Sequence, residues 1–180
     1  MALENKQIYL SIDPGYKNLG WVLAQPGKDT LDVFHQEVTH LCDWEESSPF
    51  VLISAVFRWV QTVHNKLLDH LKVKELPKAC VTILIEEQYF IPGKGSIGVK
   101  LKVVQAILMT VLFGMDWQKV IVTLASRTVK RFFGISTNNR LENKKEMMKV
   151  LKNDFNVTLS NEHVADCYLL LLYHCTNFAN

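Results

Sequence analysis

Three segments of the chain carry acids or a histidine where packing alone does not require them. Asp13 ends the apolar run of SIDPGYKNLGW, and Glu86 and Glu87 end a second apolar run, ILIEEQ. His163 and Asp166 stand three residues apart, and on a helix this spacing puts both side chains on one face. Carboxylates held within a few ångström repel one another, and a bound divalent cation is the usual way to relieve the repulsion.

If the fold brings these segments together, their chemistry suits a hydrolytic metal site. Oxygen-rich ligand sets favour Mg²⁺ or Mn²⁺. Two such ions, roughly 4 Å apart, activate water and stabilise the leaving oxygen in phosphodiester cleavage. The pattern therefore predicts two divalent ions bound between the three segments.

Each of these residues also has an explanation without chemistry. An Asp before Pro-Gly commonly starts a turn, as Asp13 does in SIDPG. Acids at a strand end can simply be solvated, and Asp166 near the start of a helix complements the helix dipole. His163 taken alone is more often a surface or capping residue than a ligand. Only the joint arrangement favours the metal site.

A second candidate feature is the basic segment 127–152. It contains eight Lys and Arg residues against two Glu, a local excess of six, although the whole chain has a net charge of only +2. The segment is either a solvated helix face or a face that binds a polyanion, because phosphate contacts need such clusters of cations. The eight bases are Arg127, Lys130, Arg131, Arg140, Lys144, Lys145, Lys149 and Lys152.

The elements that must position these residues follow from the hydrophobic pattern. Three apolar or alternating runs with short turns predict an antiparallel meander, and the rest alternates helices with buried strands. This order predicts one α/β domain over residues 1–180, with a five-stranded mixed sheet and helices on both faces. The expected strands are 7–13, 19–24, 31–39, 79–88 and 119–126, and the expected helices are 49–73, 99–113, 127–134, 142–155 and 160–175.

Composition narrows the class of protein. With 48% hydrophobic and 21% charged residues, the chain is expected to be a soluble globular protein rather than a disordered one. No apolar run reaches the roughly 18 to 20 residues that span a bilayer, and MALENKQ lacks a signal pattern, so we expect an intracellular protein. The four cysteines form no C-x-x-C pair, which disfavours a zinc knuckle or a disulfide framework and predicts reduced, mostly buried thiols.

The motifs SIDPGYKNLGW, LIEEQYF and EHVADCYLLLL, in this order, resemble the RuvC-type Holliday junction resolvases of the RNase H-like superfamily. The similarity spans nearly the whole chain, including EQYFIPGKGSIGVKL and the basic RTVKRFFGI and NKKEMMKVL. The I-E-x-Q form at 85–88 and the later HVAD are similar to poxvirus-type and mitochondrial members. The resemblance implies an RNase H-like (RuvC-type) fold and a homodimeric endonuclease that nicks four-way DNA junctions symmetrically with Mg²⁺ or Mn²⁺.

The same resemblance implies metal-ligand roles for Asp13, Asp166 and one glutamate. The I-E-x-Q register selects Glu86, whereas the bacterial E-Q-Y-F register selects Glu87, and only one of them can face Asp13 because strand side chains alternate. We favour Glu86, since an Ile-Glu step ends the buried run. His163 falls where many members carry another Asp, and its neutral imidazole lowers the negative charge of the site and suits Mn²⁺ at least as well as Mg²⁺.

The resemblance also assigns contacts with DNA to the basic segment. Lys130 and Lys144 match positions where bacterial members carry basic residues important for activity, with Lys145 as a near-register alternative to Lys144. A lysine there would offset charge building on the scissile phosphate, so Lys144 is expected to be catalytic. Arg127 and Arg131 complete the expected DNA-binding set.

Two further features of the sequence each have two possible explanations. Tyr89 and Phe90 occupy the place of a family aromatic that stacks on an unpaired base at the junction centre, or else they pack in the core or in a dimer interface. The helix 99–113 resembles the family's dimer helix, or else it is plain core.

Four functions follow from these observations, with the resolvase first. A ribonuclease H or a less selective branched-DNA nuclease would keep the fold and change the substrate. A junction-binding protein without cleavage is the third, because His163 replaces an expected carboxylate. An actin-like ATPase is disfavoured by the short chain and by the lack of a second Gly-rich phosphate loop. The poxvirus-type features in one small domain lead us to expect a virus-encoded protein, active where viral DNA replicates.

Overall fold

The computed structural model describes residues 6–27, 31–43, 49–73, 79–88, 96–135, 139–159 and 161–178. Strands precede helices in the first part of the chain, and helices dominate the last part. The elements are β1 (Lys6–Pro14), β2 (Asn18–Pro26), β3 (Leu31–His40), α1 (Pro49–Val73), β4 (Ala79–Glu87), α2 (Ser96–Gly114), β5 (Lys119–Ala125), α3 (Ser126–Phe132), α4 (Arg140–Phe155) and α5 (Glu162–Phe178).

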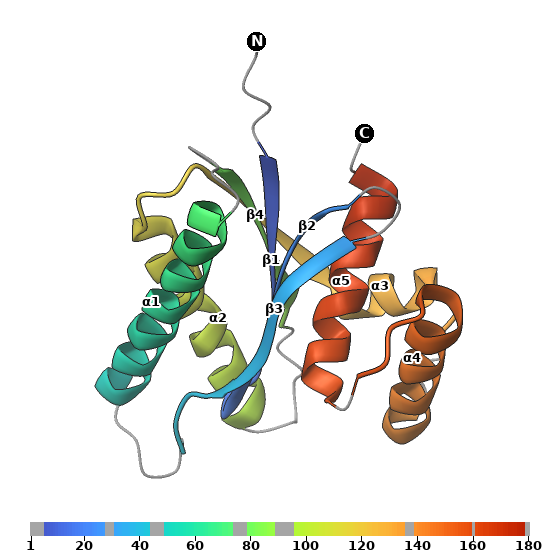
Figure 1. Cartoon of the computed structure of the whole chain (residues 1–180). Coiled ribbons are helices and arrows are strands. Elements are labelled where there is room, and N and C mark those ends of the chain that lie inside the picture. Colours follow the sequence, from blue (N-terminus) through green and yellow to red (C-terminus); the bar gives the residue numbers. More distant parts are fainter. Residues whose placement is uncertain are drawn as a thin grey trace.

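The strands form one five-stranded sheet in the order β3-β2-β1-β4-β5 (Figure 1). β1, β2 and β3 are antiparallel neighbours, whereas β4 runs parallel to both β1 and β5. The tight turn after β1 requires glycine, because a Cβ on Gly15 would lie 2.0 Å from the carbonyl oxygen of Asn18. The predicted mixed sheet, with its antiparallel meander, is confirmed.

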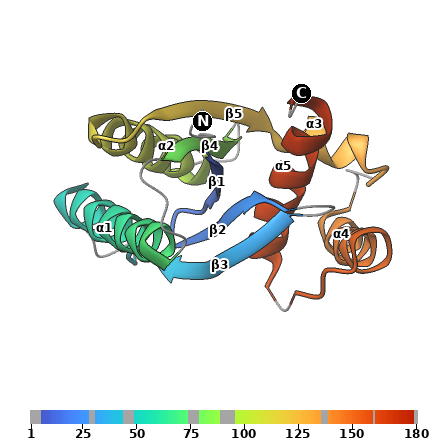
Figure 2. The same ribbon diagram turned by 45° about the horizontal axis from the view of Figure 1, so that its top comes forward.

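Helices cover both faces of the sheet, as predicted. Figures 1 and 2 show α1 and α2 on one face and α5 across the other, with α3 and α4 beyond α5. The alternation of strand side chains separates two cores. On β1, Ile8 and Leu10 pack under α1 and α2, while Tyr9 packs under α5. The cleft described below lies on the α5 face.

Some element ends differ from the sequence-based expectation. α4 begins at Arg140 rather than at 142, since the Asn139 side chain accepts hydrogen bonds from the backbone of Leu141 and Glu142. Ser126 opens α3 instead of ending β5. The expected stop at Gly134 lies just beyond α3, where this glycine adopts a left-handed φ of 70°.

Two further observations concern the state of the cysteines and the apolar character of the helices. All four cysteines are free thiols; Cys42 and Cys167 are buried, and Cys80 and Cys175 are half-buried. Within the described part of the chain, no helix has the length and apolar character needed to span a bilayer.

Candidate active site

A cleft of about 750 Å³ opens where β1 and β4 end. Ile12 on β1 pairs with Ile85 on β4, so the residues that follow them, Asp13 and Glu86, share one face of the sheet. Both line the cleft, together with His163 and Asp166. The four residues that were expected to converge are therefore close together.

The register also separates the two glutamates. Glu86 lies on the Asp13 side of β4, and alternation along the strand turns Glu87 to the opposite side. Glu86 makes a side-chain hydrogen bond with Asp13. Of the two alternatives, Glu86 is the one placed to share chemistry with Asp13, and its role as a ligand stays a prediction.

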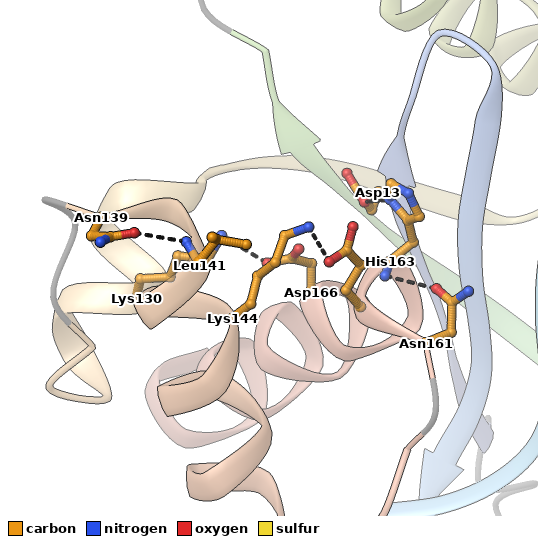
Figure 3. A network of polar contacts seen from close by, with 9 residues as sticks. Asp13, Lys130, Asn139, Leu141, Lys144, Asn161, His163 and Asp166 are labelled. Atoms are coloured by element: carbon orange, nitrogen blue, oxygen red, sulfur yellow. Dashed lines mark hydrogen bonds and ion pairs between the residues drawn. The ribbon is translucent and has the colours of Figure 1, made fainter.

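The start of α5 delivers the other two residues. The Asn161 side chain accepts a hydrogen bond from the backbone N–H of His163 at 2.9 Å and so caps the helix. Nδ1 of His163 lies 2.7 Å from Oδ2 of Asp13. One turn later, Oδ1 of Asp166 lies 2.8 Å from Nζ of Lys130. Figure 3 shows these side chains in a row between the sheet and the helices α3, α4 and α5.

Two small residues on the sheet let α5 come this close, and the sequence analysis missed both. Gly20 pairs with Asp13 across β1 and β2, and a Cβ there would lie 2.7 Å from both Cβ and the carbonyl oxygen of His163. Ser11 is fully buried and donates a hydrogen bond of 2.9 Å from Oγ to the carbonyl oxygen of Cys167 on α5. A signal was available for Ser11: it lies two residues before Asp13 in an apolar run, so both side chains share one face of the strand.

The pKa values of Asp13 and Glu86 are shifted in opposite directions. Burial by itself raises the pKa of Asp13, but hydrogen bonds from His163 and Glu86 outweigh it, so the net pKa lies below its usual value. Burial raises the pKa of Glu86 well above its usual value, and the charge of Asp13 adds to that shift. The two shifts have opposite signs, so Asp13 favours its ionised form more than usual and Glu86 holds its proton more tightly than usual.

The remaining groups carry paired charges. The hydrogen bond to Asp13 raises the pKa of His163, despite its partial burial. Burial is the main reason that the pKa of Asp166 is raised, and Lys130 opposes the shift. Burial lowers the pKa of Lys130, but the surrounding carboxylates, Asp166 first, outweigh it and the net pKa is raised. The cleft therefore holds an ion pair at Lys130–Asp166 and a His163–Asp13 hydrogen bond that becomes an ion pair when His163 is protonated.

Of the other predicted DNA-binding residues, Lys144 reaches the cleft and forms an ion pair with Glu162, an acid that the sequence analysis did not single out. Lys145 lines an adjoining groove of about 720 Å³. Arg127 and Arg131 are exposed on α3 and are not among the residues that line the cleft in the described part of the chain. The predicted aromatics at 89 and 90, Tyr89 and Phe90, lie outside the described residues.

The donor set fits a divalent cation by chemistry but is not arranged for one. Four carboxylates, those of Asp13, Glu86, Glu162 and Asp166, share the cleft with one imidazole. Burial first, and then the negative charge of Asp13, raise the pKa values of Glu86 and Asp166. Among the described residues, however, no three His, Cys, Asp or Glu side chains already form a group that could hold a metal ion. Pairing with His163 and Lys130 keeps two of the carboxylates engaged.

No family model and no curated protein matches the sequence. Solved structures do match over most of the chain. RuvC from Thermus thermophilus in complex with Holliday junction substrate is 18% identical, with 94% of this chain and 92% of that chain covered and a TM-score of 0.58. The yeast mitochondrial Holliday junction resolvase Ydc2 is 17% identical, with 90% and 75% covered and a TM-score of 0.53.

A third match adds a viral protein to these. The fowlpox virus Holliday junction resolvase is 13% identical, with 94% of this chain and 97% of that chain covered and a TM-score of 0.50. Together with the five-stranded mixed sheet, these matches give the chain an RNase H-like fold of the RuvC type. The expectation about fold that the sequence motifs raised is confirmed.

Proposed function

We propose that this protein is a Holliday junction resolvase, a metal-dependent endonuclease that nicks four-way DNA junctions symmetrically as a homodimer. The observation that carries the proposal is the meeting of Asp13, Glu86, His163 and Asp166 in one cleft bordered by lysines. Two of these acids, Glu86 and Asp166, have pKa values raised by burial and by neighbouring negative charge, which is typical of a functional site rather than of a packing core. The names of the fold neighbours point to the same substrate.

In this proposal the four residues hold Mg²⁺ or Mn²⁺, two ions in all. Bound there, the ions would activate a water molecule and stabilise the charge on the leaving oxygen of the phosphodiester. The lowered pKa of Asp13 favours the ionised carboxylate that a metal ion needs, whereas the raised pKa of Glu86 opposes the ionised form, so metal binding there works against that shift. His163 contributes a ligand without adding negative charge, which suits Mn²⁺ at least as well as Mg²⁺.

The lysines of the cleft provide the cationic side of the site. Lys144 offsets charge that builds on the scissile phosphate, and Lys130 lies within the same cleft. Lys145 in the adjoining groove, with Arg127 and Arg131 on the exposed side of α3, extends this surface for phosphates further along the strand. Tyr89 and Phe90 remain candidates for stacking on an unpaired base.

Symmetrical cutting needs two active sites, and α2 is the proposed dimer helix. Its inner side packs into the core through Val104 and Leu108, while Val99 and Phe113 are 50% and 62% exposed. Apolar side chains left on the outer side of a helix favour a contact with a second copy. Phe113→Glu is expected to shift the protein from dimer to monomer in light scattering, and an unchanged dimer would contradict the role of α2.

The decisive experiment is a cleavage assay with purified protein and Mn²⁺ or Mg²⁺. A synthetic four-way junction should be nicked at symmetric positions, and Asp13→Asn should abolish nicking while still binding the junction. The same assay on a flap and on an RNA:DNA hybrid separates the resolvase from a branched-DNA nuclease and from a ribonuclease H. Binding without nicking in either metal would favour a non-cleaving junction-binding protein instead.

A viral origin also belongs to this proposal. The similarity to the fowlpox virus resolvase supports it, as do the I-E-x-Q and HVAD motifs. A virus-encoded resolvase would act inside the infected cell, where viral DNA replicates.

A further inference from the structure

Lys130 occupies an unusual place for a lysine expected to bind DNA. Its side chain is only 22% exposed, and its Nζ lies 2.8 Å from Oδ1 of Asp166, whose side chain is 20% exposed. The neighbouring Val129 is buried at 2% exposure and anchors α3 against α5. Figure 3 shows Lys130 reaching from α3 to Asp166 on α5. The lysine thus points into the acid cluster.

This pair is one of three that neutralise the acids along the start of α5. His163 pairs with Asp13, and Lys144 pairs with Glu162. Of the three cations, Lys130 is the only one in the described part of the cleft that combines a fixed positive charge with a carboxylate proposed to bind metal. A lysine ammonium is a compact point charge on a flexible stem, so it can leave one anion for another without rebuilding a fork of hydrogen bonds.

We propose that Lys130 is an exchangeable counter-cation: it neutralises Asp166 until a divalent cation takes this carboxylate, and it then pairs with a phosphate of the DNA in the same cleft. The inference rests on the proposed function, because it assumes that Asp166 is a metal ligand and that DNA enters the cleft. It explains why the donor residues meet without already forming a metal site among the described residues. Lys130 reduces the repulsion between the acids, and it also competes with the metal ion for Asp166.

The exchange has a thermodynamic consequence. A phosphate that attracts Lys130 weakens its hold on Asp166 and so strengthens metal binding, and by linkage a bound metal strengthens phosphate binding by the same factor. Lys130 would therefore make metal and DNA bind cooperatively. The cooperativity should disappear when the lysine is replaced by an uncharged side chain.

The first test measures Mn²⁺ binding in the absence of DNA, by isothermal titration calorimetry at pH 8. Lys130→Met removes the competing charge at similar side-chain length, and we expect Mn²⁺ to bind about tenfold more tightly than to the wild type. Lys144→Met is the matched control, since it removes the same charge from the same cleft but leaves the Lys130–Asp166 pair in place. It should change the Mn²⁺ affinity by less than about threefold.

A second variant covers the case in which Lys130→Met does not fold. Lys130→Arg keeps the charge and can hold a carboxylate with two parallel hydrogen bonds, so Mn²⁺ should bind more weakly than to the wild type. Equal tightening in Lys130→Met and Lys144→Met would reduce the effect to general electrostatics and overturn the proposal. Unchanged or weaker Mn²⁺ binding by Lys130→Met would overturn it as well.

The second test measures the coupling with a four-way junction that carries uncleavable phosphate analogues at its centre. Adding Mn²⁺ should tighten junction binding by wild-type protein, and by a clearly smaller factor in Lys130→Met. A factor that is the same in both proteins contradicts the exchange. Neither test depends on cleavage, so failure of the exchange is distinct from failure of the nuclease assay, in which the wild type leaves junctions uncut.

Discussion

The two faces of the same sheet are built on different principles. Over 8–12 on β1 and 81–85 on β4, the side chains toward α1 and α2 are apolar, whereas the α5 side of both strands includes polar residues and ends in an acid at the cleft. The first set is Ile8, Leu10, Ile12, Val81, Ile83 and Ile85. The second set is Tyr9, Ser11, Asp13, Thr82, Leu84 and Glu86. One strand therefore serves a stabilising core on one side and a chemical site on the other.

The two faces differ in their contribution to stability: the α1 and α2 face stabilises the fold, whereas the α5 face holds groups that destabilise it. Burial of apolar side chains under α1 and α2 stabilises the sheet without special geometry. On the α5 face, raised pKa values mark carboxylates held where their charge is unfavourable. Substitutions on the first face should change mainly the free energy of unfolding, and those on the second mainly cleavage.

The largest effect on stability is expected at Trp59, on the α1 side. Trp59 is 2% exposed and packs edge-on against Trp21, with ring centroids 6.1 Å apart. Trp59→Ala should lower the free energy of unfolding by about 3–5 kcal/mol, because it leaves a large cavity. Urea denaturation measures the loss. Cleavage per folded molecule should stay near that of the wild type, and a selective loss of cleavage would break the contrast between the faces.

The next effect is expected at Gly20, where α5 approaches the sheet. An added Cβ would collide with His163, so Gly20→Ala should displace the start of α5 and slow junction cleavage by about a hundredfold. Gly114→Ala is the matched control, because a Cβ there would meet no atom within 4 Å. Equal rates for the two variants would show that the close approach does not matter for cleavage.

A smaller effect is expected at Ser11, which ties β1 to α5. Ser11→Ala removes a buried hydrogen bond to Cys167 and should lower the free energy of unfolding by about 1 kcal/mol. Thr110→Ala serves as control, since that hydroxyl is exposed and bonds only within its own helix. A cleavage rate that falls more than about threefold in Ser11→Ala, with no change in Thr110→Ala, would show that the bond also positions His163.

The smallest effect is expected for Glu86→Gln, as a gain in the free energy of unfolding, measured with a chelator present to remove metal ions. Burial and the charge of Asp13 raise the pKa of Glu86 in the folded protein. The contribution of Glu86 to the free energy of unfolding is therefore present at a pH below the pKa of this group in the unfolded chain, and it is lost as the pH rises through the folded-state pKa. Glu86→Gln removes the charge, so it should be about 0.5–1 kcal/mol more stable than the wild type at pH 8 and no more stable at pH 5. A gain that does not vary with pH in urea denaturation would contradict the raised pKa.

The sheet and its register were predictable because they depend on local patterns. Short turns specify the meander, and strict alternation decides that only one of Glu86 and Glu87 can share a face with Asp13. The helix starts were less predictable, because Asn139 sets the start of α4 through side-chain hydrogen bonds.

The pairing within the cleft was beyond the sequence. Lys130–Asp166 and Lys144–Glu162 join different helices, and their geometry depends on how α3 and α4 pack against α5. The role of Gly20 depends in the same way on a contact with another element. The clusters of charged residues in the sequence thus predicted a site, but they did not predict which residues form ion pairs with each other.

The most direct test of the account compares junction cleavage by Glu86→Gln and Glu87→Gln in Mn²⁺. These variants replace the same carboxyl group by an amide at adjacent residues on opposite sides of β4. The account predicts that Glu86→Gln lowers the cleavage rate by about a thousandfold or more, while Glu87→Gln stays within about threefold of the wild type. Equal losses in both variants, or a larger loss in Glu87→Gln, would contradict the assignment of chemistry to the α5 face.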